Sequence, residues 1–169
     1  PKRMQMLTAN TRFTPNEHLE FTAEGAYTNF NQNTYSTLDK RNDDGLGLFF
    51  SARQKDIQFK HLKINSSFKM EYISRNFKYV ERYRSVEFNR TWNRQLNNNT
   101  SINLLANELV STFNTNLLFK EKHNLLLEAS NYNKGSVYKG YRGFGAYKYV
   151  DEKLYLSTHA ERVFIADRT

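Results

Sequence analysis

A twelve-residue segment with a two-residue period, residues 19–30, is the feature that most constrains the fold of this chain. Its sequence is LEFTAEGAYTNF, so Phe21 and Tyr27 lie on one side of an extended chain and Glu20 and Glu24 lie on the other. A strand directs every second side chain to the same face, and a helix does not. The segment is about twice as long as an ordinary strand of roughly 5–6 residues, and long enough to cross a bilayer when tilted, which takes roughly 9–11 residues.

The hydropathy of the chain excludes helical membrane proteins. Mean hydropathy is −0.79 over 169 residues, and no apolar run approaches the roughly 18–20 residues of a membrane helix. A β-barrel remains compatible with this value, because alternating lipid-facing and lumen-facing residues cancel in any average. Aromatic residues make up 15% of the chain, which favours strands.

Other segments of strand character follow along the whole chain. Strands are predicted at 4–13, 45–53, 58–74, 84–93, 124–132, 137–149 and 154–165, with a turn at 54–56. Residues 100–119 are either one long strand or a pair, 100–107 and 112–119, and the pair makes ten strands. The first connections alternate between short and long, which is usual in transmembrane barrels.

The segment 58–74 repeats the pattern of the first one. Leu62, Phe68 and Tyr72 lie on one face, and Lys63 and Lys69 lie on the other. The sequence therefore predicts one unit over residues 1–169, an all-β, antiparallel, up-and-down transmembrane β-barrel of about eight to ten strands, or a segment of a larger one. Aromatic residues near strand ends favour the membrane barrel, since interfacial girdles form there: Tyr27, Phe30, Phe68, Tyr72, Tyr147 and Tyr149. The alternative is a soluble antiparallel sheet with one buried face.

Three segments carry a resemblance to a known class of proteins. They are the strand at 19–30, the loop NTYSTLDKRNDDGLG that follows it, and NFKYVERYRSVEFNRTWN. Over most of the chain the general character of the sequence, rather than one diagnostic motif, resembles large outer-membrane β-barrels of Bacteroidota-like Gram-negative bacteria. Such barrels commonly end on an aromatic residue in the last strand, whereas the last aromatic residue here is Phe164. We therefore expect a segment of a larger barrel.

The polar rows of these strands supply the candidate lumen-lining residues. They are Glu20, Glu24, Lys63, Lys69 and Glu71. His18, His61, His123 and His159 show no metal-ligand spacing. Nothing in the sequence assembles a nucleophile, a base and an orienting group, so neither an enzyme nor a cofactor is predicted.

Residues 75–94 interleave basic and aromatic side chains, in a chain of net charge +8. Such a segment can neutralise phosphates and stack bases. Arg82, Arg84 and Arg90 are the candidate anion-binding residues. The alternative function is therefore a soluble, secreted β-sheet protein that binds an anionic glycan or nucleic acid through this segment. Within a barrel, the same residues form a solvated loop or contact anionic lipopolysaccharide.

The favoured function is an outer-membrane β-barrel that acts as a pore, a transport component or a scaffold for surface partners. The expected location is the bacterial outer membrane. The expected partners are the lipid bilayer, lipopolysaccharide and other outer-membrane or surface proteins, and no nucleic acid is expected.

Overall fold

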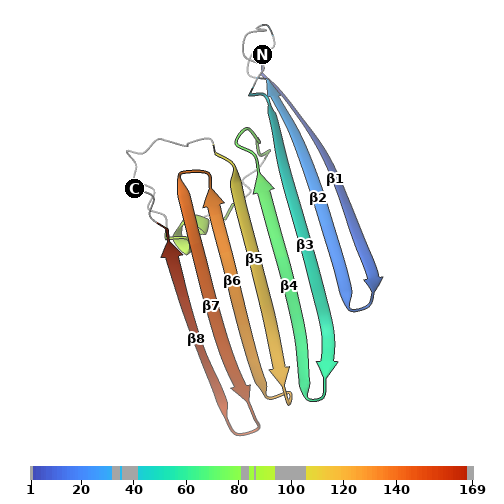
Figure 1. Ribbon diagram of the computed structural model, residues 1–169, viewed down its shortest axis with the longest axis vertical. Coiled ribbons are helices and arrows are strands. Elements are labelled where there is room, and N and C mark those ends of the chain that lie inside the picture. The colour runs from blue at the N-terminus through green and yellow to red at the C-terminus, as the bar shows by residue number, and fades with distance from the viewer. Residues whose placement is uncertain are drawn as a thin grey trace.

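Eight antiparallel strands form a single sheet in which each strand pairs with its neighbours in sequence (Figure 1). The computed structural model describes residues 2–31, 35, 42–80, 84–85, 87–93 and 106–166. The strands are β1 (Arg3–Asn16), β2 (Leu19–Asn31), β3 (Asp44–Phe59), β4 (Leu62–Ile73), β5 (Glu108–Phe119), β6 (His123–Lys134), β7 (Tyr138–Val150) and β8 (Tyr155–Ile165). The predicted all-β, antiparallel, up-and-down fold class is confirmed. The described sheet is open, with β1 and β8 at its two edges.

Two of the predicted elements are wrong. The strand predicted at 84–93 is instead a short helix, α1 (Phe88–Thr91), within an irregular segment. The turn predicted at 54–56 is a β-bulge, because β3 continues to Phe59 and its register with β4 shifts between Gln54 and Ile57. The second strand of the possible pair, 112–119, lies within β5, whereas 100–105 fall outside the described residues.

The bulge explains why a polar triplet sits inside a strand. Asp56 has a φ of 55°, a left-handed conformation that Asp tolerates better than most residues. Its backbone N–H donates to Asn65 Oδ1 at 2.8 Å. Beyond the extra residue, Ile57 pairs with Ile64 and returns to the apolar side of the sheet.

The register separates the side chains into two faces, since directly paired residues share a face. One cross-strand row of the apolar face runs through all eight strands, with each residue paired to the next: Thr11, Ala23, Phe50, Met70, Ser111, Asn131, Tyr141 and Phe164. Apart from tyrosines, the ionisable side chains that the register places on this face are Arg3, Asp44, His123, Lys139 and Arg162. Each of them lies within four residues of one end of its strand, so the middles of the strands carry no charge on the apolar face.

The connections are also distributed unequally. At one end of the sheet, which we call the short-turn rim, the strands are joined by residues 17–18, 60–61, 120–122 and 151–154. At the other end, which we call the long-connection rim, they are joined by residues 32–43, 74–107 and 135–137. The predicted order of short and long connections is confirmed for the first four, although the third lies at 60–61 and not at the predicted 54–56.

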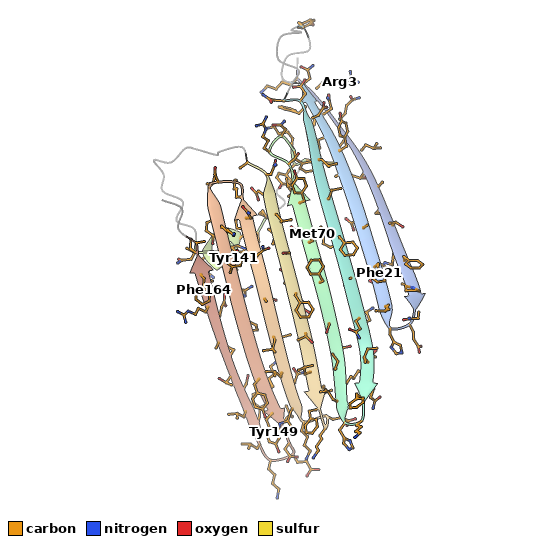
Figure 2. All side chains as sticks on the ribbon, in the orientation of Figure 1. Arg3, Phe21, Met70, Tyr141, Tyr149 and Phe164 are labelled. Carbon is orange, nitrogen blue, oxygen red and sulfur yellow. The ribbon has the colours of Figure 1, made fainter. Side chains whose placement is uncertain are left out.

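Aromatic side chains lie near both rims of the apolar face. Figure 2 shows Phe21 and Tyr149 toward the short-turn ends of β2 and β7, and Tyr141 and Phe164 toward the long-connection ends of β7 and β8. Two of the aromatic residues predicted at strand ends of this face lie elsewhere. Phe68 is in the middle of β4, where it pairs with Phe113, and Phe30 is on the polar face, where Lys78 Nζ lies 5.9 Å from its ring centre.

An ion pair at the short-turn rim gives a prediction about pH. Lys122 Nζ lies 3.0 Å from Asp151 Oδ1. The hydrogen bond from Lys122, with smaller contributions from the Glu152 N–H and Tyr149 Oη, lowers the pKa of Asp151. The pair therefore stabilises the turn above the ordinary Asp pKa, and this stabilisation is lost as pH falls through the lower folded value. We expect Lys122→Gln to raise the Asp151 pKa, measured by carboxyl NMR with Asp151→Asn for assignment. An unchanged Asp151 titration in the variant contradicts the assignment of the cause.

Candidate functional site

The polar face brings the predicted lumen-lining residues together. Glu20, Glu24, Lys63, Lys69 and Glu71 all lie on this face. Glu24 and Glu71 are in one cross-strand row, because both pair with Phe49. The structure therefore gathers residues from β2 and β4 that the sequence could only group strand by strand.

Ion pairs between neighbouring strands cross the polar face. Glu20 accepts from Arg53 at 3.3 Å and from Lys55 at 3.4 Å. In the second half of the sheet, Arg142 bridges Glu128 at 2.8 Å and Glu161 at 2.7 Å. Arg53, Lys55 and Glu161 are exposed, whereas Glu20, Arg142 and Glu128 are part-buried. Surface ion pairs contribute only about 0–1 kcal/mol each, so these pairs mark a charge-balanced polar face rather than a stabilising core.

Part of the connection between β4 and β5 folds back on the polar face. We call residues 74–80, 84–85 and 87–93, the described part of that connection, the covering segment. At its start, the Phe77 ring lies against Gly47, and Phe77 backbone atoms approach Gly45. The Lys78 N–H donates to Thr28 Oγ1 at 3.3 Å, and Thr28 is fully buried. The two glycines of β3 leave room for this approach because they carry no Cβ.

The close approach at Gly45 gives a test of the contact. A Cβ at Gly45 would lie closer than 3.0 Å to the backbone of Phe77, so Gly45→Ala is expected to displace this part of the covering segment. We expect faster hydrogen exchange at the Lys78 amide, whose acceptor is Thr28. Gly143→Ala is the matched control, since a Cβ there meets nothing within 4 Å. Equal exchange of the Lys78 amide in the two variants contradicts the expected displacement.

Arg84 anchors the middle of the covering segment. Its Nη1 lies 2.6 Å from Glu71 Oε2, and its Nη2 lies 3.9 Å from Glu108 Oε2. Its guanidinium lies 4.5 Å from the centre of the Phe88 ring. Lys134 in turn lies 2.9 Å from Glu108. These part-buried charges tie the segment to β4, β5 and β6 together.

The candidate anion-binding residues have different surroundings. Arg84 is held by carboxylates on the sheet. Arg90 is exposed and pairs with Glu87 at 2.7 Å within the segment. Arg82 lies outside the described residues. Each of the two described arginines therefore already faces a carboxylate.

An aromatic cluster holds the end of the covering segment. Trp92 and Tyr132 are only 3% and 1% exposed, and their ring centres lie 5.5 Å apart. Phe88 packs edge-on against Tyr132 at 5.1 Å, and Tyr138 Oη donates to the Trp92 carbonyl at 2.5 Å. This cluster contains two of the three buried hydrophobic residues in the described chain. The nearest equivalent of a core therefore lies between the segment and the polar face.

Sequence reasoning missed this packing, although one signal pointed to it. Near the long-connection rim the polar face carries apolar residues, Phe49, Ile73, Val110 and Tyr132. Such exceptions to alternation mark a place where another element covers the sheet.

Tyr79 is the one residue of the covering segment whose pKa is clearly shifted from its ordinary value. Burial, assisted by the negative charges of Glu108 and Glu71, raises the pKa of Tyr79 to about 12. Arg84 opposes this shift. Tyr79 is therefore a neutral hydrogen-bonding group at any physiological pH.

The described residues contain no group of three His, Cys, Asp or Glu side chains placed to hold a metal ion. In the same ranges no helix is long and apolar enough to cross a membrane. No protein-family model matches the chain, and no match is found among curated proteins or solved structures.

Proposed function

We propose that this chain forms part of the wall of a β-barrel in the bacterial outer membrane, and that the barrel acts as a pore, a transport component or a scaffold for surface partners. The apolar face would contact lipid, and the polar face would line a water-filled lumen. The observation that carries the proposal is the segregation of charge between the two faces of one sheet, with an uncharged middle on one face.

The length of the strands supports this arrangement. The strands have 11 to 16 residues. At the usual rise per residue, a strand of 12 residues is about 40 Å long. A tilt of about 45° reduces its height to about 28 Å, close to the roughly 30 Å of a bilayer's hydrocarbon core.

The exposure of the apolar face also supports it. Leu48, Phe113 and Leu127 are each more than 40% exposed, although they lie well inside their strands. Soluble proteins rarely leave large continuous apolar patches in water. Lipid would bury this face without any further protein layer.

In a bilayer the edge strands need partners as well, because unpaired backbone groups cost several kcal/mol each in hydrocarbon. The outer edges of β1 and β8 have no neighbouring strand among the described residues. The proposal therefore includes further strands that pair with these two edges and complete the wall.

Cysteine labelling tests which face contacts lipid. The chain contains no cysteine, so Phe113→Cys and Thr112→Cys each introduce a single thiol, on opposite faces of β5. In vesicles, a water-soluble maleimide is expected to label the thiol at position 112 and to spare the thiol at 113. A soluble sheet predicts the reverse order, since Phe113 is 48% exposed and Thr112 is half-buried. Unfolding in urea, which should allow both thiols to react, serves as the control.

The soluble anion-binding alternative has less support. It requires available cations in residues 75–94, yet Arg84 and Arg90 pair with carboxylates. A salt titration of binding to heparin and to single-stranded DNA distinguishes the two functions. Strong, salt-sensitive binding by a protein that is monodisperse without detergent would favour the alternative.

A further inference from the structure

A cavity of about 650 Å³ lies between the polar face of β1–β4 and the covering segment. Most of its lining is apolar or aromatic, and its Thr, Asn and Glu side chains come from β1 and β2. The side chains that matter for recognition are Met6, Asn10, Glu24, Phe49, Phe77 and Tyr79. Its size is within the roughly 300–1,000 Å³ of pockets for small molecules.

The walls of the cavity are fixed by contacts already described. Phe77 is seated on Gly47, and the Lys78 N–H is bonded to Thr28. The Phe77 and Tyr79 rings meet edge-to-face, with centres 5.2 Å apart. Phe49 projects from β3 on the same face. The aromatic part of the cavity is therefore preformed.

The charge of the cavity is negative and comes from one residue. Glu24 is the only Asp, Glu, Lys or Arg in the lining, and it makes no ion pair with any described residue. Tyr79, another titratable group of the lining, is neutral at physiological pH. Asn10 lies directly opposite Glu24 in the register of β1 and β2, so its side chain adds a second polar group beside the carboxylate.

We propose that this cavity binds a small amphipathic organic cation. The ammonium group of the ligand would pair with the Glu24 carboxylate beside Asn10, and its apolar body would lie against Met6, Phe49 and Phe77. A cation near aromatic faces gains further attraction from the ring quadrupoles. The proposal does not depend on which solvent the apolar face meets, because the cavity is on the opposite face.

Binding of 1-naphthylmethylammonium, compared with the neutral 1-naphthylmethanol, tests the proposal. Both are measured by fluorescence titration of the whole chain in the same detergent, so that partitioning into micelles is matched. We expect the cation to bind about tenfold more tightly than the alcohol, and Glu24→Gln to remove this preference. Glu161→Gln is the matched control, since Glu161 is on the same face but outside the cavity.

Equal affinity of the two probes for the unmodified chain, or an undiminished cation preference in Glu24→Gln, would overturn the proposal. Circular dichroism of both variants checks that the sheet has formed. A negative result in this binding test would not change the result expected from maleimide labelling of positions 112 and 113. The ligand proposal and the membrane proposal can therefore fail separately.

Discussion

Replacing Leu127 with arginine is expected to destabilise the proposed membrane-inserted state by about 2–4 kcal/mol, the usual cost of a lipid-facing arginine near the bilayer midplane. Leu127 lies on the apolar face of β6 and is 42% exposed. In a soluble sheet, arginine at such an exposed position would change the free energy of unfolding by about 0.5 kcal/mol or less. Urea unfolding of the protein in vesicles measures the difference.

Leu126→Arg is the matched control, because it makes the same chemical change one residue earlier on the polar face. Leu126 pairs with Asn116 and Ala146, and Glu128 follows two residues later on the same face. An arginine there would lie on the charge-balanced polar face, near Glu128. If Leu126→Arg and Leu127→Arg cost the same, the apolar face does not meet lipid.

The period-two pattern predicted the strands because alternation is a local property of the chain. Glu20 and Phe21 belong to opposite faces whatever β2 pairs with. The rows of Lys63 and Phe68 in β4 follow from the same rule, and the structure confirms both. The polarity of each face of the sheet could therefore be predicted from single segments.

The covering segment could not be predicted in this way, because its conformation depends on distant partners. Arg84 is held by Glu108, which lies 24 positions later in the sequence, and Trp92 is packed by Tyr132. A helix of four residues has no stability of its own. Local propensity therefore suggested a strand where tertiary contacts produce an irregular segment.

The polar face thus has two regions with different chemistry. Toward the short-turn rim it is solvated and charge-balanced, as in the Glu20–Arg53 pair. Toward the long-connection rim, apolar side chains receive the covering segment and bound the cavity at Glu24. In a barrel, the first region would conduct water and polar solutes, and the second would narrow the lumen and select among them.

Replacing Trp92 with alanine is expected to detach the end of the covering segment from the sheet while the strands stay paired. Truncation of a buried tryptophan costs about 3–5 kcal/mol. This loss falls on contacts with Phe88 and Tyr132 rather than on the backbone ladders. Amide exchange at Thr91 and its neighbours in α1 should therefore accelerate by about 100-fold or more. If the barrel is a pore, its unit conductance should rise as well.

Two further variants separate detachment from general destabilisation. Tyr138→Phe keeps the ring and removes the hydrogen bond to the Trp92 carbonyl, which contributes about 1 kcal/mol, so its effect on the α1 amides should be roughly tenfold or less. Tyr155→Ala truncates an aromatic residue that is 65% exposed, far from the cluster in sequence, and should leave those amides unchanged. Loss of the sheet's circular dichroism in Trp92→Ala would contradict the expectation, since the aromatic cluster would then hold the strands together and not only the segment that covers them.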